Sequence, residues 1–445
     1  MGLVGAERQI RIWNRVEQLP VEEKRQLQAA RLRRMVDYAY RRVPFYRQLF
    51  DRHGVSPEHI RALEDLSRIP FTRKSDLVEN YPFGFLAVDL KEIVRLHATS
   101  GTTGRPVVIG YTEEDLDVWA EAMARTFTLA GVTAGDVIQN AFGYGLFTGG
   151  LGFHMGAEAI KATLIPIATG LSQRQVMLMR DLGTTVLTCT PSYALTLADT
   201  LAEMGMKPQE LRLRVGIHGA EPWTDGMRQQ IEERLGLEAF DNYGLTEMFG
   251  PAVATECHYH QGLHVQDDLF YPEVVDPASG EPLPPGEVGE LVLTSLARTG
   301  MPLLRYRTRD LTALIPEPCP CGRTTVRIKR IVGRVDDMLV IRGVNVFPSQ
   351  IETVLMEFAE LAPHYQIIVD RPKNLDTLEV QVEATEELWK QGPEVCSGLA
   401  ARVRAKLTQA IIATPAVTIL PPGRLPRIEQ GKARRVIDRR NLGNA

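Results

Sequence analysis

A stretch rich in serine, threonine and glycine lies between two short apolar segments of the sequence, and it reads His-Ala-Thr-Ser-Gly-Thr-Thr-Gly-Arg-Pro over residues 97–106. The apolar and β-branched residues at 93–96 and 107–112 predict two strands that form a hairpin. Hydroxyl and backbone N–H groups at such a tip can surround a polyanion, because Gly101 and Gly104 carry no side chains that block its approach. The stretch lacks the pattern of a Walker loop, and an ordinary polar hairpin is the alternative.

A second candidate for phosphate chemistry follows a predicted strand that ends in glycine, at 215–222. Residues 241–247 read Asp-Asn-Tyr-Gly-Leu-Thr-Glu. The hydroxyl of Thr246 and the carboxylate of Glu247 can together bind a phosphate oxygen and a hard divalent cation. Taken alone, a polar turn is the alternative explanation.

Cysteine and histidine side chains provide a separate set of metal-ligand candidates. The set has the order Cys…His…Cys-x-Cys and consists of Cys257, His264, Cys319 and Cys321, with His258 and His260 as alternative ligands. Soft sulfur and nitrogen donors suit a structural, four-coordinate Zn²⁺. The spacing differs from the usual C-x₂₋₄-C, and reduced thiols without a metal are the alternative. Five cysteines in a chain of 445 residues do not form a disulfide framework.

Composition restricts the class of protein. Hydrophobic residues make up 44% of the chain and charged residues 24%, which is typical of soluble globular proteins. A net charge of −4 gives no electrostatic footprint for a nucleic-acid partner. We see no apolar run long enough to span a bilayer and no signal-peptide core, so we expect a cytoplasmic protein with neither a membrane nor a nucleic-acid partner.

The pattern of apolar residues divides the chain into regions. Residues 1–90 predict a helical cap, and the region after it, to about 240, alternates strands and helices, which is typical of parallel sheets covered by helices. Short strands with Pro/Gly turns at 253–332 predict an antiparallel, barrel-like part. We therefore predict an α/β fold. Its large N-terminal domain, 1–335, has two helix-covered sheets plus the barrel-like part, and a small mobile α/β domain spans 336–445.

Several of these motifs occur in the order found in the acyl-adenylate-forming superfamily. The 97–106 stretch resembles its phosphate-binding signature, residues 243–247 resemble its "YG.TE" motif, and 306–310 resemble its "YRTGD" motif. Pro-Phe-Tyr at 44–46, Tyr-Pro-Phe-Gly at 81–84, Arg-Gly-Val-Asn-Val-Phe-Pro at 342–348 and the basic ending at 425–435 resemble the phenylacetate–CoA ligase family within that superfamily.

The resemblance implies a role for each matching residue. The residues that it assigns to nucleotide binding are Thr99, Ser100, Gly101, Thr102, Thr103, Gly104, Gly219, Ala220, Glu221, Pro222, Asp241, Asn242, Tyr243, Gly244, Asp310 and Arg334. It implies that Lys432 is the catalytic lysine, that Glu247 binds Mg²⁺ and that Thr246 contacts the α-phosphate. Asp336 corresponds to the hinge residue, and the turn at Gly343, Val344 and Asn345 to a wall of the CoA tunnel. Physically, the Lys432 ammonium can neutralise charge that develops between a carboxylate and the α-phosphate.

Glycines beside aromatic residues make room for a flat ring and suggest an acyl pocket at Tyr144, Gly145, Phe147, Gly150 and His218. Core packing of the aromatic residues is the alternative. The chain departs from the family pattern at Ala220 and Arg309, where glycine is common, and at Gln430, which stands between Glu429 and Gly431.

The resemblance implies an AMP-forming aryl-acid–CoA ligase, most like phenylacetate–CoA ligase, that uses ATP, Mg²⁺ and coenzyme A and forms a homodimer. Phenylacetate, substituted phenylacetates, indoleacetate and benzoate all fit a flat apolar pocket. One alternative is an adenylyltransferase similar to coenzyme F390 synthetase, which uses no CoA. Another is a non-catalytic nucleotide-binding relative.

Overall fold

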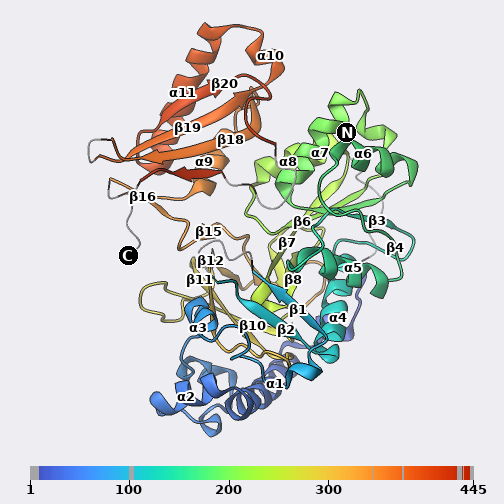
Figure 1. Cartoon of the computed structure of the whole chain (residues 1–445), viewed down its shortest axis with the longest axis vertical. Coiled ribbons are helices and arrows are strands. Elements are labelled where there is room, and N and C mark those ends of the chain that lie inside the picture. Colours follow the sequence, from blue (N-terminus) through green and yellow to red (C-terminus); the bar gives the residue numbers. More distant parts are fainter. Residues whose placement is uncertain are drawn as a thin grey trace.

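The computed structural model describes residues 10–99, 105–342, 344–372, 375–427, 433 and 435–440 (Figure 1). A large mixed sheet with helices on both faces forms its centre, and the small domain that ends the chain lies against one end of it.

Nine strands form the central sheet. From edge to edge they are β13 (Leu314–Ile315), β14 (Arg327–Ile328), β9 (Leu263–Val265), β8 (Gly250–Glu256), β7 (Glu238–Leu245), β6 (Val215–Gly219), β5 (Val186–Cys189), β3 (Val137–Asn140) and β4 (Thr163–Ile165). The strands from β4 to β7 run parallel. A single turn, η6 (Thr246–Met248), separates β7 from β8, and this short connection makes β8 antiparallel to β7.

Helices cover the two faces of this sheet. Successive residues of a strand point to opposite faces, and accordingly Val186 packs with helices α4 (Glu113–Leu129) and α5 (Gly149–Ala159). Its neighbour Leu187 packs with the helices of the other face, which are α6 (Ser172–Asp181), α7 (Pro191–Glu203) and α8 (Asp225–Leu235). The 3₁₀ helix η5 (Pro208–Glu210) lies between α7 and β6.

The N-terminal region is helical, as predicted. It contains η1 (Arg15–Gln18), α1 (Val21–Arg42), α2 (Pro44–Arg52), η2 (Pro57–His59), η3 (Leu63–Arg68), α3 (Lys74–Glu79) and η4 (Leu90–Glu92). The predicted hairpin follows, with β1 (Arg95–Ala98) antiparallel to β2 (Val108–Tyr111).

A second, four-stranded antiparallel sheet packs beside the large one. Its strands are β10 (Phe270–Val275), β11 (Gly289–Ser295), β12 (Tyr306–Thr312) and β15 (Gly333–Arg334). Their inner side chains, including Phe270, Leu291 and Tyr306, belong to the same hydrophobic core as α1, α2 and α4.

The C-terminal residues have a hydrophobic core of their own, built from residues between Leu339 and Ile411. A hairpin of β16 (Leu339–Ile341) and β17 (Val344–Val346) precedes α9 (Pro348–Leu355). The sheet of this domain has the order β20–β19–β18–β21, and α11 covers it. Its elements are β18 (Leu361–Asp370), β19 (Thr377–Ala384), α10 (Glu386–Trp389), α11 (Pro393–Ile411), β20 (Ala416–Leu420) and β21 (Val436–Asp438).

The α/β class with a small C-terminal α/β domain is confirmed, and two details differ from expectation. The strands expected in two helix-covered sheets join one sheet, because β8 continues it directly after β7. The strands expected in one barrel-like part at 253–332 divide, since β10, β11 and β12 form the second sheet while β9, β13 and β14 extend the large one. Among the described residues, no helix has the length and apolar character needed to cross a membrane.

Candidate active site

The turn η6 presents Thr246 and Glu247 directly after β7. Both side chains are buried. A Glu247 carboxylate oxygen accepts a hydrogen bond from the hydroxyl of Tyr306 at 3.1 Å, and the hydroxyls of Thr246 and Thr148 lie 3.5 Å apart. The turn therefore holds a carboxylate and a hydroxyl side by side, as the sequence predicts for a phosphate and cation site.

Asp310, on β12, is held between two other predicted nucleotide-binding residues. The Tyr243 hydroxyl donates to one carboxylate oxygen at 2.6 Å, and the Arg334 guanidinium donates to the other at 3.1 Å. Burial and the nearby carboxylate raise the pKa of Tyr243, so its hydroxyl remains a donor. Asp310 and Arg334 are direct neighbours across β12 and β15.

The backbone conformation at Arg309 explains why glycine is common at this position of the family motif. Its φ of +68° lies in the left-handed region that favours glycine. The arginine adopts this conformation while its N–H donates to Glu290 at 3.1 Å and its carbonyl accepts from Val335 at 2.8 Å. These two backbone hydrogen bonds fix the turn that presents Asp310.

Arg298 is a buried residue of the site that no sequence motif identified. Its side chain is fully buried, and the guanidinium lies over the rings of Tyr111 and Phe249 at 5.0 and 5.1 Å. It donates to the backbone carbonyl of Glu247. Tyr306 is the second residue that was missed, although it begins the motif that contains Asp310. Arg298 has no motif around it and so gives no signal in a single sequence, whereas the motif that contains Tyr306 does not reveal its contact with Glu247.

The base of the predicted phosphate loop is described, whereas Ser100, Gly101, Thr102, Thr103 and Gly104 lie outside the described residues. Thr99 pairs with Val107 through its N–H and its hydroxyl, both at 3.0 Å. The N–H of Ala98 donates to the carbonyl of Leu146 at 2.9 Å. These contacts anchor the hairpin next to the predicted acyl pocket.

The predicted adenine segment, Gly219–Pro222, follows β6. A Cβ on Gly219 would lie 2.0 Å from the carbonyl of Asn242, so only glycine fits there. Ala220 has a φ of +73°, which accounts for the glycine common at this position. The carboxylate of Glu221 accepts from the backbone N–H of Ser192 at 2.7 Å and from that of Ala433 at 2.9 Å.

On β7, the three predicted nucleotide-binding residues other than Tyr243 have structural contacts. Asn242 accepts from the hydroxyl of Thr255 at 2.9 Å, inside the sheet. Asp241 faces Arg330, 3.4 Å away, and burial raises its pKa to about 6. A Cβ on Gly244 would lie 2.0 Å from the carbonyl of Gly250, so glycine permits the close pairing of β7 and β8.

The predicted acyl-pocket residues divide into two groups. Tyr144, Gly145, Phe147 and Gly150 lie between β3 and the first turn of α5. The hydroxyl of Tyr144 accepts from the amide of Asn140 at 2.7 Å, and Phe147 is 38% exposed. His218 forms the second group. Its ring is fully buried beside Trp223 and contacts the carbonyl of Cys189 at 3.2 Å.

The predicted lysine and part of the CoA turn lie outside the described residues, since Lys432 and Gly343 are among those that the structure does not describe. Val344 and Asn345 lie on β17. Asp336, the predicted hinge residue, forms a two-point ion pair with Arg334 at 2.8 and 3.0 Å. Arg334 thus connects the predicted hinge residue to Asp310.

Comparison with known proteins gives the family of this chain. The AMP-binding enzyme family matches residues 30–297, and the AMP-binding enzyme C-terminal domain matches residues 343–440. The chain belongs to the AMP-binding enzyme family.

The sequences of curated relatives match nearly the whole length of this AMP-binding enzyme. A phenylacetate-coenzyme A ligase of Thermus thermophilus is 52% identical over 96% of this chain and 98% of the relative. A second phenylacetate-coenzyme A ligase, from Escherichia coli, is 47% identical over 97% of this chain and 98% of the relative. The predicted kinship with phenylacetate–CoA ligases is confirmed.

Solved structures of 2-hydroxyisobutyryl-CoA ligase, 31% identical, match in two states. In the postadenylation state with R3-HIB-AMP the TM-score is 0.91, over 96% of this chain and 92% of that chain. In the thioesterification state with 2-HIB-AMP and CoA it is 0.70, over 95% and 91%. This AMP-binding enzyme is therefore described in an arrangement closer to the postadenylation state.

The contacts that hold this arrangement involve α7. Asp199 accepts from His364 at 2.8 Å and from Arg427 at 3.0 Å, both from the C-terminal domain. Between the two domains of the AMP-binding enzyme lies a cleft of about 1620 Å³, whose lining includes Glu221, Trp223, Arg330, Asp336 and Glu352.

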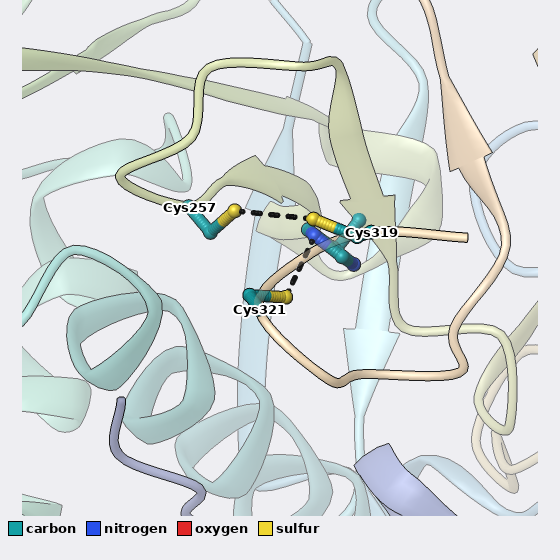
Figure 2. Close-up of side chains that lie close together, drawn as sticks. Cys257, Cys319 and Cys321 are labelled. Atoms are coloured by element: carbon teal, nitrogen blue, oxygen red, sulfur yellow. Dashed lines mark hydrogen bonds between the residues drawn. The ribbon is translucent and has the colours of Figure 1, made fainter. Parts of the chain in front are cut away.

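The four predicted metal ligands of the AMP-binding enzyme also come together. Their ligand atoms all lie within 4.8 Å of one another, and Figure 2 shows Cys257, Cys319 and Cys321 gathered around one point. His264 is the fourth member of this group, while the alternative His260 pairs with Glu238 at 3.2 Å. Cys189 and Cys396 are buried away from this group, each in a different hydrophobic core.

Proposed function

We propose that this AMP-binding enzyme is an AMP-forming aryl-acid–CoA ligase whose substrate is phenylacetate or a close arylacetate. Two hydrogen bonds carry the assignment: Tyr306 donates to Glu247, and Tyr243 donates to Asp310. Because Tyr306 and Asp310 share β12, these bonds bring a cation ligand and a ribose acceptor to one part of the molecule. Relatives named phenylacetate-coenzyme A ligase at 46 to 52% identity support the acid.

The proposed reaction has two steps. A carboxylate oxygen of the acid attacks the α-phosphorus of ATP, the bond to pyrophosphate breaks, and acyl-AMP forms. The CoA thiolate then attacks the acyl carbon, and AMP leaves with the electron pair of the broken C–O bond. Activation is needed because a carboxylate is a poor electrophile.

The side chains of the site have distinct parts in the first step. Asp310 accepts the ribose hydroxyls, Arg334 holds the Asp310 carboxylate in place, and Thr246 donates to the α-phosphate. The N–H of Ala433 donates to Glu221 at the adenine segment. Lys432, which precedes Ala433 in the sequence, is assigned to the same phosphate as Thr246. Its ammonium group neutralises charge that builds up in the transition state.

Two metal ions belong to the proposal. Mg²⁺ fits Glu247 and Thr246, because both supply oxygen donors, and when bound it offsets the charge of the ATP phosphates. Zn²⁺ fits Cys257, His264, Cys319 and Cys321, because sulfur and imidazole nitrogen are the donors that it prefers.

We further propose that residues 336–445 form a mobile domain that rotates between the two steps. The different TM-scores against two states of one relative support this rotation. Arg334 and Asp336 are the pair at the hinge, and the turn at Gly343, Val344 and Asn345 then lines the CoA tunnel. Lys432 serves the first step and this turn the second.

Two further expectations belong to the proposal: a homodimer, which the family resemblance implies, and the cytoplasmic location expected in the sequence analysis. Light scattering coupled to gel filtration measures the first, since a dimer has twice the chain mass of 49.6 kDa. Fractionation of cells tests the second.

The experiment that tests the ligase is a panel of carboxylic acids assayed for AMP release with and without CoA. We expect AMP release when both phenylacetate and CoA are present. ATP–pyrophosphate exchange should need phenylacetate but not CoA. The Lys432→Ala variant should lose the exchange, whereas Lys390→Ala, at an exposed ion pair of α10, should retain it.

Two results would overturn the assignment. Transfer of AMP to a hydroxyl acceptor without thioester formation would identify an adenylyltransferase. Binding of ATP without exchange for any acid on the panel would identify a non-catalytic relative.

A further inference from the structure

We infer that Cys257, His264, Cys319 and Cys321 form a closed zinc site, and that the bound ion fastens the N-terminal segment, residues 11–19, to the body of the protein. This inference extends the zinc of the proposed function, and it does not depend on the ligase reaction.

The distances between the ligand atoms match a tetrahedral zinc centre. Zinc binds sulfur at about 2.3 Å and imidazole nitrogen at about 2.0 Å, so two sulfurs of a tetrahedron lie about 3.8 Å apart and sulfur and nitrogen about 3.5 Å. The sulfurs of Cys257 and Cys319 are 3.7 Å apart, and the sulfur of Cys321 is 3.5 Å from Nε2 of His264 (Figure 2).

The surroundings of the four ligands favour a structural ion. Nδ1 of His264 lies 2.8 Å from the Thr325 hydroxyl, which leaves Nε2 as the metal-binding nitrogen. All four ligands are buried, and Leu129 of α4 packs against the three cysteines. Four protein donors in a buried group leave no open coordination position for a substrate, which is typical of structural zinc.

Charge around the site is also consistent with a bound ion. Three thiolates and one Zn²⁺ leave a single negative charge. Arg327, the direct cross-strand neighbour of His264, is buried and donates to the carbonyls of Gln261 and Glu317. The guanidinium of Arg327 therefore offsets the negative charge of the zinc site.

The chain between β13 and β14 depends on the ligands for its shape. Residues 316–326, all of them described, contain no helix or strand. One turn closes it, where the N–H of Gly322 donates to the carbonyl of Cys319 at 3.1 Å and Gly322 has a φ of +74°. We call residues 319–325, which carry two cysteine ligands and Thr325, the metal loop.

The metal loop is also the docking surface of the N-terminal segment. Arg323 forms a fully buried ion pair with Glu17, 2.5 Å from its carboxylate. The N–H of Thr324 donates to the carbonyl of Glu17 at 2.9 Å, and its hydroxyl donates to that of Leu19 at 2.6 Å. Loss of the ion therefore releases the metal loop from its folded shape, and with it the surface to which η1 is attached.

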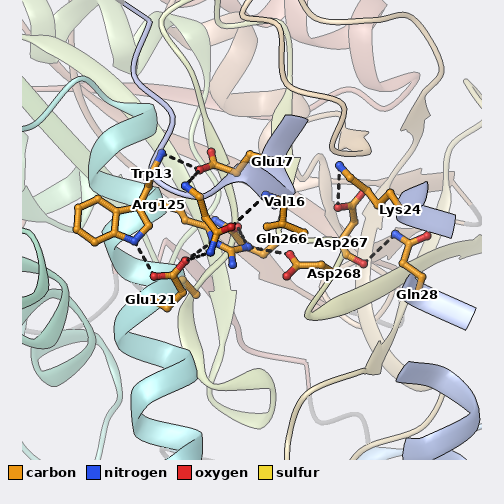
Figure 3. Close-up of polar contacts among 12 residues, drawn as sticks. Trp13, Val16, Glu17, Lys24, Gln28, Glu121, Arg125, Gln266, Asp267 and Asp268 are labelled. Atoms are coloured by element: carbon orange, nitrogen blue, oxygen red, sulfur yellow. Dashed lines mark hydrogen bonds and ion pairs between the residues drawn. The ribbon is translucent and has the colours of Figure 1, made fainter. Parts of the chain in front are cut away.

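The other face of the N-terminal segment contacts α4. Trp13 and Asn14 both donate to the Glu121 carboxylate, at 2.6 and 2.8 Å, and Glu121 pairs with Arg125 at 3.1 Å (Figure 3). Trp13 is 41% exposed, so water competes for these hydrogen bonds. The buried contacts with the metal loop are the stronger of the two attachments.

Metal analysis tests the site itself. Protein purified without chelator should contain one zinc per chain by elemental analysis. The Cys319→Ser and His264→Gln variants should lose it, while Cys396→Ser should keep it, because Cys396 lies in the core of the C-terminal domain. Glu17→Gln should also keep zinc, because it changes the segment and no ligand.

Trypsin cleavage after Arg15, an exposed residue of the segment, tests the attachment. Chelation of zinc from the wild-type protein at neutral pH should increase the cleavage rate by about tenfold or more, since cleavage requires local unfolding. Glu17→Gln should increase it with zinc still bound, and Cys396→Ser should not change it.

Each result decides one part of the inference. A folded wild-type protein without zinc, or with a disulfide between Cys257 and Cys319, overturns the site. Zinc loss without faster cleavage overturns the attachment. Neither assay contains ATP, acid or CoA, so failure of the ligase proposal appears separately, as missing CoA-dependent AMP release from zinc-loaded protein.

Discussion

The hydroxyl of Tyr306 donates a hydrogen bond to the carboxylate of Glu247 at 3.1 Å, and both side chains are buried. Four residues further along β12, Asp310 accepts a hydrogen bond from Tyr243 of β7 at 2.6 Å. One strand of the second sheet therefore fixes the proposed cation ligand and the proposed ribose acceptor relative to each other. The spacing between these two groups is set by β12 and not by a flexible loop.

Tyr306→Phe should raise the Mg²⁺ concentration needed for half-maximal ATP–pyrophosphate exchange by about tenfold. The reason is that a hydrogen bond to a charged group contributes about 1.5 kcal/mol, and here it orients the Glu247 carboxylate. A Mg²⁺ titration of exchange measures this. Tyr271→Phe, on β10 of the same sheet, is the matched control and should leave the titration unchanged. An unaltered Mg²⁺ dependence in Tyr306→Phe would rule out this positioning role.

Arg298→Lys should lower the rate of exchange by about ten- to a hundredfold with a smaller effect on the KM for ATP. Lysine keeps the positive charge, but it lacks the planar guanidinium that stacks between Tyr111 and Phe249 and donates to the Glu247 carbonyl. Displacement of Glu247 then impairs the transition state more than ground-state binding.

Steady-state kinetics of Arg298→Lys should be compared with Arg180→Lys, at an exposed arginine of α6 that takes no part in the proposed site. Circular dichroism and thermal unfolding should establish that both variants fold. If Arg298→Lys retains wild-type turnover, the buried guanidinium has only a packing role.

Sequence reasoning located the motifs, because phosphate loops, Thr-Glu pairs and Cys-x-Cys sets limit the residue types that can occupy each position. It could not locate Arg298 or the contact between Tyr306 and Glu247, because these depend on how two sheets pack. The sequence placed His264 in the ligand set and kept His258 and His260 as alternatives, and the structure agrees with that set. All three histidines are near Cys257 in sequence, and the antiparallel pairing of β9 with β8 and β14 brings His264 to the cysteines.

Asp199→Asn should weaken the docking of the C-terminal domain in the described arrangement. The wild-type carboxylate pairs with His364, Arg427 and Arg234, and although burial opposes it, these contacts hold the pKa of Asp199 below its ordinary value. Removal of the charge leaves Arg234 without this counterion and breaks the ion pair with Arg427, whose other pair, with Glu383 at 2.9 Å, remains. We expect exchange to fall by about three- to tenfold, because an ion pair of this kind contributes about 1 kcal/mol.

The second half-reaction distinguishes docking from general damage. Thioester formation from synthetic acyl-AMP and CoA should remain near the wild-type rate in Asp199→Asn, since that step is proposed to use another domain arrangement. Asp181→Asn, at an exposed ion pair at the end of α6, is the control. Equal loss in both half-reactions would contradict a role specific to the described arrangement.

The pH dependence of stability should reveal the burial of His218. Burial lowers the pKa of this histidine to about 4, and its Nε2 has no hydrogen-bond partner among the described residues. An unfolded histidine has a pKa of about 6.5, so between these two values the unfolded chain binds more protons than the native state. The resulting stabilisation is fully present above about pH 6.5, and it is lost as the pH falls toward about 4. The loss is roughly 3 kcal/mol, because one pKa unit corresponds to about 1.4 kcal/mol.

Urea unfolding between pH 4.5 and 7.5, compared with a His218→Gln variant, measures this contribution, since glutamine does not titrate in the range. The free energy of unfolding of the variant should fall less steeply with acid than that of the wild type. Gln48→Asn, at an exposed position of α2 that does not titrate, should leave the wild-type slope unchanged. Because His218 lies beside Cys189 and Trp223 and not in open space, an identical slope in His218→Gln and wild type would mean that the ring is solvated, and its assignment to a wall of the acyl pocket would gain support.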